Sequence, residues 1–323
     1  MRFFITGVSG FAGSHLACLL LDRGHFVAGA AREARSLATL HRRYGERFPT
    51  SAVDICDIRD HAALREALAR AEPDGVYHLA ALTFVPKSFE RPALAYEVNF
   101  LGSIELLAAV RDVAPRARVV LVTSGEVYGW IDSARDLPLV ESQPLRPLSP
   151  YSVAKAAADL AAFQFFWSDS LDVVRARPFN HTGPGQTADF VCSEFARALA
   201  AAESGSGPKR LQVGNLEVER DFSDVRDVVR GYLSLFEKGI AGEAYNLGSG
   251  RATRVRTVLD ELREQCRVPV EVDVDPRKLR PREVTRVVGS IEKIGRDTGW
   301  RPEIPLRQTL VDLLDHWRQE LNR

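Results

Sequence analysis

Two residues with side chains suited to acid–base chemistry, Tyr151 and Lys155, stand four positions apart. Positions i and i+4 of a helix lie on the same face, so the phenol and the ammonium are expected side by side. A positive charge beside a phenol lowers its pKa from about 10 and makes it a usable proton donor or acceptor near neutral pH. The spacing therefore predicts an acid–base pair that acts on a carbonyl or alkoxide oxygen.

A hydroxyl from another part of the chain is expected to join this pair. Residues 117–123 read ARVVLVT, an apolar and β-branched run that predicts a buried strand. Ser124 follows directly, at the carboxyl end of that strand, where α/β folds place their chemistry. Ser124 can hydrogen-bond the oxygen that Tyr151 protonates, and Thr123 beside it is the competing choice. A nicotinamide would deliver hydride to the carbon that carries this oxygen.

The start of the chain predicts a dinucleotide-binding turn. Three glycines spaced three apart follow the apolar strand Arg2–Thr6 and open a helix predicted over Phe11–Arg23. The first permits a tight turn, the second lets the backbone approach a pyrophosphate, and the third lets helix and strand pack closely. The helix N-terminus then faces the negative charge. The residues expected at this turn are Gly7, Gly10, Phe11, Ala12 and Gly13.

The second predicted strand, His25–Ala31, ends where the adenine ribose of a dinucleotide would lie. An NAD site more often carries an acid there, which accepts from the ribose 2′-hydroxyl. This chain offers Arg32, with Arg35 nearby, and a guanidinium suits a 2′-phosphate through paired charged hydrogen bonds. We therefore expect NADP(H) in preference to NAD(H). The alternative is that Arg32 is a solvated surface charge.

The ends of the third and fourth strands, predicted at 51–54 and 75–79, supply further cofactor contacts. Asp54 and Ile55 are expected near the adenine. His78 stands where the chain would pass the cofactor, although packing of a strand end against a helix explains it nearly as well. The other residues expected beside the cofactor here are Leu79, Ala80 and Ala81.

Apolar strands alternate with helical patterns up to about residue 177, which predicts a parallel sheet covered on both faces. Beyond Pro178 the pattern is less regular, which favours a smaller lobe. We expect an α/β chain with a doubly wound parallel sheet (Rossmann) and a smaller mixed α/β C-terminal substrate lobe. The expected division is a dinucleotide-binding domain at 1–177, to which segments near 214–247 return, and a nucleotide-sugar-binding lobe mainly at 178–323.

Composition limits the class of protein. The chain has 323 residues, 45% of them apolar, and its 43 basic and 43 acidic residues cancel, so no net charge favours a nucleic acid or an anionic membrane. No leader pattern opens the chain, and no stretch approaches about 18 apolar residues without charge. The four cysteines are scattered and form no metal-binding motif. We expect a cytoplasmic protein with free thiols, no metal, and no nucleic-acid or membrane partner.

The glycine turn, the serine after the fifth strand and YxxxK within SPYSVAKAAAD together resemble the extended short-chain dehydrogenase/reductase family. That family includes nucleotide-sugar epimerases, dehydratases and reductases. The resemblance extends over nearly the whole chain, to the GWRP run at Gly299–Pro302 and the final helix. It implies that Ser124, Tyr151 and Lys155 are catalytic and that the last two also contact the cofactor.

The second half of the chain resembles the GDP-mannose branch of this family. Four runs carry the resemblance: RPFNHTGPGQ at 177–186, GNLEVERDF at 214–222, GEAYNLGSG at 242–250 and DPRKLRPREV at 275–284. They imply a GDP-linked sugar as the partner. The residues that the resemblance places at this substrate are Ser124, Asn180, Val191, Arg220, Arg280 and Glu283.

The residue types fit a nucleoside diphosphate, whose two phosphates suit arginine forks. Arg220 and Arg280 are the candidates, and the alternative for each is an ion pair within the lobe, for instance with Asp221 or Glu283. Asn180 is expected to hydrogen-bond the substrate or to hold its loop. Glu283 is the candidate for the ribose hydroxyls.

The resemblance implies one of two reactions. A reductase of this branch uses NADPH to reduce the C4 keto group of a GDP-linked 4-dehydro-6-deoxy sugar, which gives GDP-6-deoxy-D-mannose (GDP-D-rhamnose). A GDP-mannose 4,6-dehydratase also needs a base for the C5 proton, and Glu126 stands where the dehydratases carry that glutamate. Alternatively, Glu126 only shapes the pocket. The NHTGPGQ run favours the reductase.

Two further functions stay open, namely another nucleotide-sugar epimerase or dehydratase and a non-catalytic NADP-binding protein. The intact set of Ser124, Tyr151 and Lys155 opposes the second. The resemblance also implies pairing through two helices, here 93–113 and 154–168, in a homodimer or a tetramer. The aromatic residues of the second helix fit such an interface and core packing equally well.

Overall fold

The computed structural model describes residues 1–45, 52–131, 136–279 and 283–322. Seven strands form a parallel sheet in the order β10-β6-β5-β4-β1-β2-β3. The chain adds β2 and β3 on one side of β1 and then crosses to β4 on the other, so the strand order reverses between β1 and β4. Ligands bind at such a reversal, outside the carboxyl ends of the strands. The strands are β1 (Arg2–Thr6), β2 (Phe26–Ala31), β3 (Val53–Ile55), β4 (Gly75–His78), β5 (Arg118–Val122), β6 (Val173–Pro178) and β10 (Ala244–Leu247).

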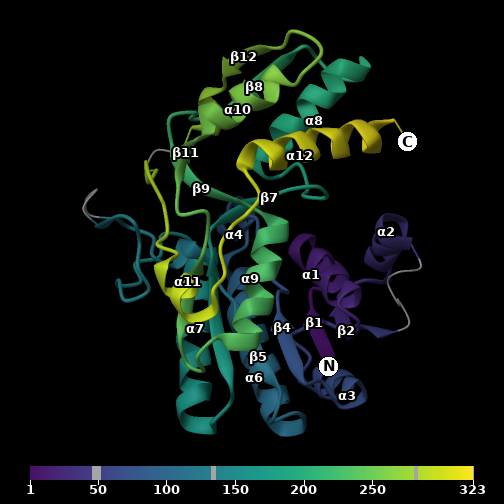
Figure 1. Cartoon of the computed structure of the whole chain (residues 1–323), viewed down its shortest axis with the longest axis vertical. Helices are drawn as coiled ribbons and strands as arrows, with labels where there is room; N and C mark the ends of the chain where they lie inside the picture. Colours follow the sequence, from purple (N-terminus) through teal and green to yellow (C-terminus); the bar gives the residue numbers. More distant parts are fainter. Residues whose placement is uncertain (46–51, 132–135, 280–282, 323) are drawn as a thin grey trace.

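Helices cover both faces of this sheet (Figure 1). One face carries α1 (Phe11–Asp22), α2 (Ala34–Tyr44) and α9 (Val225–Lys238). The other carries α3 (His61–Ala71), α6 (Gly102–Val113) and α7 (Pro150–Asp169). Two short helices, α4 (Val85–Glu90) and α5 (Pro92–Tyr96), lead through a π-helical turn at Glu97–Leu101 into α6. The doubly wound arrangement predicted from the sequence is therefore confirmed.

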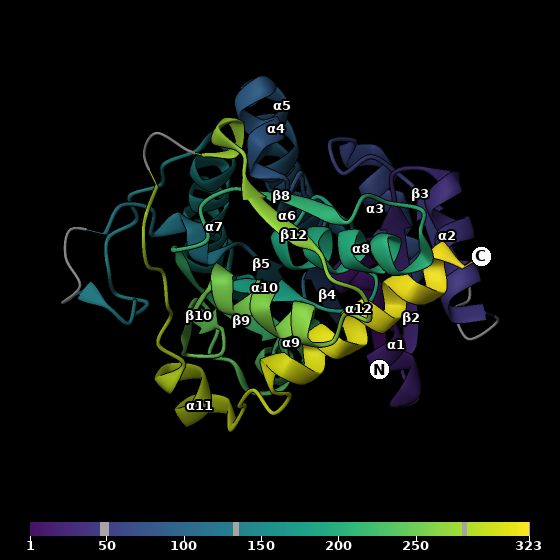
Figure 2. The same ribbon diagram turned by 90° about the horizontal axis from the view of Figure 1, so that it is seen from above.

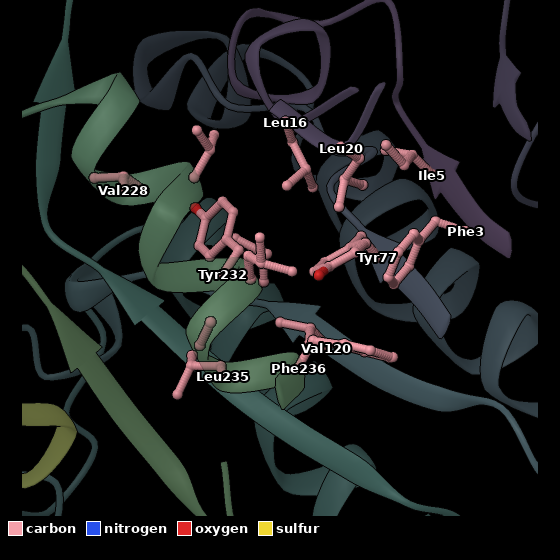
Figure 3. Packing of buried hydrophobic residues seen from close by; sticks show 14 of the residues in the cluster. Phe3, Ile5, Leu16, Leu20, Tyr77, Val120, Val228, Tyr232, Leu235 and Phe236 are labelled. Atoms are coloured by element: carbon pink, nitrogen blue, oxygen red, sulfur yellow. The ribbon is translucent and has the colours of Figure 1, made fainter. Parts of the chain in front are cut away.

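Apolar side chains from the sheet, α1 and α9 form one continuous core (Figure 3). Phe3 of β1 meets the ring of Phe236 of α9 edge-on, with the ring centroids 4.8 Å apart. Leu16 and Leu20 of α1 and Tyr232 of α9 are fully buried in the same cluster. Burial of each large side chain stabilises the fold by about 1.5–3 kcal/mol. This core holds the first helix, and with it the glycine turn, against β1.

A smaller lobe lies over the carboxyl ends of the strands (Figures 1 and 2). It has a core of its own, formed by α8, α10, α12 and the strands beside them. Its sheets have the orders β11-β9-β7, in which β11 runs antiparallel to β9, and β12-β8. Its elements are β7 (Asn180–Thr182), α8 (Val191–Ser204), β8 (Arg210–Val213), β9 (Glu219–Asp224), β11 (Ala252–Arg254), α10 (Val255–Glu264), β12 (Glu271–Val274) and α12 (Leu306–Leu321). The helix α11 (Glu292–Thr298) instead packs on α9 beside the large sheet.

The predicted strands and helices of the first half agree with the structure to within a few residues, and small differences have local causes. The third strand covers 53–55, and Ser51, where we predicted its start, lies outside the described residues. The helix predicted at 93–113 is interrupted by the π-helical turn, and Asn99 within this turn is buried and bonds the backbone of Leu82 through both side-chain atoms, at 2.7 and 3.0 Å.

The helical run Pro92–Val113 is long and apolar enough to cross a membrane by length and composition, a point that the sequence prediction overlooked. Its most apolar window is 44% buried, and the run packs on α3 and α7. Length and composition alone are weak evidence for a span. The absence of a membrane partner stays a prediction.

A buried ion cluster fixes α7 against the sheet. Asp159 of α7 accepts hydrogen bonds from Arg175 (2.7 Å) and from two nitrogens of Arg177 (2.9 and 2.7 Å), both on β6. Thr123, at the end of β5, donates to the same carboxylate at 3.2 Å. Burial acts to raise the pKa of Asp159, but the two guanidiniums outweigh it and hold this pKa below its usual range. Asp159 therefore stays ionised and joins β5, β6 and α7 at one point.

Removing one partner of this cluster should destabilise the fold strongly. We expect Asp159→Asn to lower the free energy of unfolding by about 3–5 kcal/mol, because it leaves the buried charge of Arg177 unpaired. Urea unfolding followed by circular dichroism measures this. In the double variant Asp159→Asn/Arg177→Met the loss of unfolding free energy should be smaller than the sum of the losses measured for Asp159→Asn alone and for Arg177→Met alone. Additivity of the two losses within about 0.5 kcal/mol would contradict the coupling.

Candidate active site

The glycine turn after β1 has the geometry of a pyrophosphate cradle. Gly7 has φ +69°, and its N–H donates to the carbonyl of Ala30 at 3.0 Å. A Cβ at Gly13 would lie 2.2 Å from the carbonyl oxygen of Gly7, so no larger residue fits. The first turn of α1 contains no acid, and no side chain caps it. Its backbone N–H groups, those of Phe11 and Ala12 included, can therefore face an anion.

The residues predicted at the adenosine end follow the carboxyl ends of β2 and β3. Arg32 and Arg35 are 74% and 85% exposed, and both are ion-paired with Glu33. Asp54 accepts a hydrogen bond from Arg70 at 2.8 Å, whereas the side chain of Ile55 is half exposed. Of the two, Ile55 therefore presents an apolar surface at the end of β3.

His78, the last residue of β4, bonds two hydroxyl groups through its ring nitrogens. Its Nδ1 lies 2.7 Å from the hydroxyl of Thr6, and its Nε2 lies 2.9 Å from the hydroxyl of Ser103. Burial lowers the pKa of His78 to about 3, so the ring is neutral. The structure thus favours the packing alternative for this residue. The half-buried residues that follow it, and that border the glycine turn, are Leu79, Ala80 and Ala81.

The N-terminus of α7 places the predicted catalytic pair against the carboxyl end of β5. Ser149 caps α7 by accepting the N–H of Ser152 at 3.1 Å, and Pro150 follows it in the first turn. Tyr151 lies close enough to Ser124 for the serine hydroxyl to influence its pKa. Lys155 donates to the carbonyl of Val122 at 2.9 Å. The structure therefore brings together the three residues that sequence spacing selected.

The pKa values of this pair correct the sequence-based expectation. Burial raises the pKa of Tyr151 to about 12, and the hydrogen bond from Ser124 offsets only part of this effect. Burial also lowers the pKa of Lys155 to about 8. The expected fall in the pKa of Tyr151 through Lys155 was wrong, because desolvation of the buried phenol dominates. Near neutral pH the phenol therefore carries its proton, and the lysine carries its charge below about pH 8.

Ser124 and Thr123 differ in what their hydroxyls contact. Thr123 donates to the carbonyl of Ala176 at 3.0 Å and to Asp159, so it belongs to the buried ion cluster. Ser124 instead lies beside Tyr151 and influences the pKa of its phenol. The carboxylate of Glu126 is exposed and close enough to Tyr151 to raise its pKa. Glu126 thus borders the catalytic pair, as its sequence position predicted.

On the substrate side, the structure separates the alternatives for Arg220. Its guanidinium lies 3.5 Å from Glu283, and both side chains are less than one fifth exposed. Asp221 instead accepts four hydrogen bonds, from the N–H groups of Ser249, Gly250 and Gly289 and from the Ser249 hydroxyl. An ion pair with Glu283 is therefore present, and one with Asp221 was a wrong alternative. Arg280 lies outside the described residues.

Asn180 and Val191 border the loop that enters the smaller lobe. Asn180 opens β7 with an exposed side chain, and Val191 is the first residue of α8. Gln186 braces the loop between them, because it donates to the carbonyl of His181 at 2.9 Å and accepts from Thr182 at 2.6 Å. The loop is therefore held in one shape, with Asn180 free to contact a ligand.

The sequence prediction missed two residues at the site. Asp159 stands four residues after Lys155, so the helical spacing that paired Tyr151 with Lys155 could have placed it on the same face. Glu33 follows Arg32 directly, and an acid at the end of the second strand is a known dinucleotide signal. Within the described ranges no three histidine, cysteine, aspartate or glutamate side chains gather as metal ligands, and none of the four cysteines is in a disulfide.

Comparison with known proteins places this site in a family. A family model described as GDP-mannose 4,6 dehydratase matches residues 4–313. A GDP-6-deoxy-D-mannose reductase of Pseudomonas aeruginosa is 36% identical over 320 residues, which cover 99% of this chain and 98% of that protein.

Two solved structures have the same fold throughout. The structure of RMD from Pseudomonas aeruginosa complexed with NADPH has a TM-score of 0.86 and 33% identity, and the match covers 99% of this chain and all of that one. The UDP-glucose 4-epimerase of Thermus thermophilus in complex with NAD has a TM-score of 0.85 and 30% identity, with 98% and 99% covered. From the family match and the full-length relative, the chain belongs to the GDP-mannose 4,6-dehydratase family of short-chain dehydrogenase/reductase enzymes.

Proposed function

We propose that this protein is a reductase that uses NADPH to convert the C4 keto group of GDP-4-dehydro-6-deoxy-D-mannose into the alcohol of GDP-6-deoxy-D-mannose. One observation carries the proposal, namely that the N-terminus of α7 places Tyr151 and Lys155 against the carboxyl end of β5, where burial keeps the phenol protonated. A reduction needs a proton donor at the keto oxygen, and Tyr151 is in that form. The full-length likeness to a GDP-6-deoxy-D-mannose reductase supports the substrate.

The residues divide the work at the keto oxygen. Ser124 and Tyr151 hydrogen-bond it, and Tyr151 passes its proton to the alkoxide that develops there. The ammonium of Lys155 stabilises the phenolate that this transfer leaves, and the Val122 carbonyl holds the ammonium in place. NADPH bound along the glycine turn would supply the hydride.

The proposed substrate site lies on the lobe above the catalytic pair. Arg220 would exchange its contact with Glu283 for a phosphate of GDP, which leaves Glu283 for the ribose hydroxyls. Asn180 and Val191 would line the approach to the sugar. Arg280, assigned from the sequence resemblance alone, would be the second phosphate ligand.

We also propose the division into a dinucleotide-binding domain at 1–177 and a substrate lobe mainly at 178–323. Within the second range, α9 and β10 return to the large sheet and its core.

NADPH is the cofactor we propose in preference to NADH. Arg32 and Arg35 at the end of β2 suit its 2′-phosphate, and one relative of the same fold was solved with NADPH. We also propose that the protein works in the cytoplasm, because four free thiols fit a reducing compartment.

Glu126 supports a second candidate, a GDP-mannose 4,6-dehydratase. Its exposed carboxylate borders Tyr151, where it could remove the proton α to a 4-keto group. The family model that matches this chain is named for that reaction. A dehydratase regenerates its cofactor in each turnover, whereas a reductase consumes it, so stoichiometry separates the two.

A paired assay tests the two functions. We expect GDP-4-dehydro-6-deoxy-D-mannose to consume one NADPH for each product, with a mass gain of two hydrogens. Absorbance of the reduced nicotinamide and mass spectrometry measure this, and NADH in a parallel assay measures the cofactor preference.

GDP-mannose with NADP⁺ is the matched control substrate. Loss of water from it without net change in cofactor would overturn the reductase and make Glu126 the base. For a reductase, Glu126→Gln should lower kcat by less than about tenfold, whereas Tyr151→Phe should lower it by about 10²-fold or more, because it removes the proton donor.

The lowered pKa of Lys155 predicts how activity depends on pH. Because this pKa is about 8, the ammonium is present below that pH and is lost above it. We expect kcat for reduction to be level near neutral pH and to fall as the pH rises through about 8. Lys155→Arg keeps its charge throughout this range. Persistence of the same fall in the Lys155→Arg variant would assign it to another group.

We propose that the protein forms a homodimer through α7 and the helix at 92–113. On α7, five residues that reach the surface alternate four and three positions apart, as in the seam of a coiled coil. They are Val153, Ala157, Leu160, Gln164 and Trp167. Trp167 and Leu160 are 76% and 62% exposed, and Leu101 on the neighbouring helical run is 48% exposed. Two copies would bury these side chains in a four-helix bundle, from which a tetramer could be built by a second contact.

The dimer predicts a specific response to charge on this seam. Leu160→Glu should convert the protein from dimer to monomer at micromolar concentration, because it would bury an unpaired charge in the bundle. Sedimentation velocity or light scattering after gel filtration measures the mass. Ile240→Glu, at a site 54% exposed elsewhere on the surface, is the matched control and should leave the dimer intact. A monomeric unmodified protein at the same concentration would rule out this interface.

A further inference from the structure

Two side chains of α1 contact the loop that enters the smaller lobe. Phe11, the first residue of α1, lies face to face with His181, with the ring centroids 6.0 Å apart and the ring planes 8° apart. His15, one turn further along α1, meets the ring of Phe11 edge-on at 5.6 Å. Its Nε2 lies 2.9 Å from the carbonyl of Pro184 and must donate there, because a carbonyl oxygen only accepts. The loop therefore touches the start of α1 at two points.

This segment, residues 180–186, is here called the linking loop, and it is braced from within and from the smaller lobe. The N–H of Gln186 donates to the carbonyl of Gly183 at 3.2 Å. The hydroxyl of Ser193, on α8, donates to the carbonyl of Gln186 at 2.7 Å. The indole N–H of Trp317, on α12, donates to the same hydroxyl at 2.9 Å. A shift at one end of the linking loop therefore reaches its other end.

The linking loop begins at the proposed sugar contact. Asn180 precedes His181 in β7, and the whole of this strand pairs in parallel with β9. Nδ1 of His181 lies 3.1 Å from the carbonyl of Phe179, which ties the ring to the same backbone. Burial lowers the pKa of His181, so the ring is neutral at neutral pH and packs on Phe11 without a charge. The place of the His181 ring therefore sets the place of Asn180.

The first turn of α1 is incomplete without an anion. Its first four N–H groups have no acceptor inside the helix, and no side chain of the described residues caps it. A pyrophosphate would accept hydrogen bonds from these groups and act as the missing cap. Because a cap stabilises a helix terminus, the bound cofactor would hold Phe11 more firmly than the empty turn does.

We propose that the linking loop couples the cofactor site to the sugar site, with His181 and His15 as positioning residues. Bound cofactor fixes the first turn of α1, Phe11 then fixes His181, and the linking loop places Asn180 for the sugar. Cofactor and GDP-linked sugar each bind more tightly when the other is present, and by the same factor. The inference rests on the proposed function for the identity of the sugar and for the cofactor at the glycine turn.

Hydrogen exchange tests the first half of this coupling without any sugar. The exchange of the peptide that contains residues 181–190 is followed by mass spectrometry, with and without saturating NADPH. We expect NADPH to slow this exchange by about tenfold, a factor within the range usual for coupled sites. In His181→Ala, NADPH should still bind but should no longer slow the exchange, because the ring contact with Phe11 is lost. His181→Phe keeps a ring that can stack and should restore the protection.

Binding of GDP-mannose tests the second half. GDP-mannose with NADPH allows no turnover by either candidate function, because a reductase would lack its keto group and a dehydratase would need NADP⁺. Titration calorimetry measures the affinity for GDP-mannose with and without NADPH. We expect NADPH to tighten this affinity by about tenfold and His181→Ala to reduce the factor to about one. His15→Ala, which removes the bond to Pro184, should reduce the factor in part.

The matched control is His25→Ala. His25 meets Phe3 edge-on, with the ring centroids 5.2 Å apart, just beyond the other end of α1. Its removal should leave both the protection of the linking loop and the affinity factor unchanged, because this ring contact lies away from the glycine turn.

The outcomes separate the coupling from the proposed function. Protection by NADPH that persists in His181→Ala would overturn the coupling, because the cofactor would then act on the linking loop without this ring. An affinity for GDP-mannose that NADPH does not change would overturn it as well. If NADPH protects the linking loop through His181 but GDP-mannose does not bind, the proposed function fails while the link between turn and loop stands.

Discussion

The ion cluster around Asp159 is the constraint on which the catalytic site depends. The buried carboxylate of Asp159 accepts hydrogen bonds from two guanidiniums on β6 and from the hydroxyl of Thr123 after β5. These bonds together fix how α7 is rotated and where it lies along the sheet. Tyr151 and Lys155 lie on the same face of that helix, about two turns and one turn before Asp159. A buried ion pair tolerates little displacement. The cluster therefore fixes the position of α7 on the sheet, and with it the position of the Tyr151 phenol beside Ser124.

The same buried setting determines which reaction the site favours. In water a neighbouring ammonium would have pulled the pKa of Tyr151 down, but desolvation raises that pKa and lowers that of Lys155. The resulting pair is a protonated phenol beside a lysine that is charged only up to about pH 8. This state is ready to donate a proton to a keto oxygen, which suits a reductase. Glu126, at the open side of the pair, is the remaining feature that suits dehydration.

The binding sites for cofactor and sugar share one design, in which charged residues are paired before the ligand arrives. Arg220 contacts Glu283, and Arg32 and Arg35 contact Glu33. In the proposed function, each of these arginines would exchange its carboxylate for a phosphate of the ligand. The glycine turn and the catalytic pair would not need such an exchange of a carboxylate for a phosphate.

Local spacing and periodicity determined much of this protein from the sequence alone. The glycine turn, the strands and helices of the first half and the Tyr151–Lys155 pair depend on neighbours within a few residues, so they could be predicted. Tertiary structure alone decided the partners of charged residues, because Asp159 meets Arg177 and Arg220 meets Glu283 across long stretches of chain. It also decided the pKa values, since burial of Tyr151 depends on packing that no short segment contains.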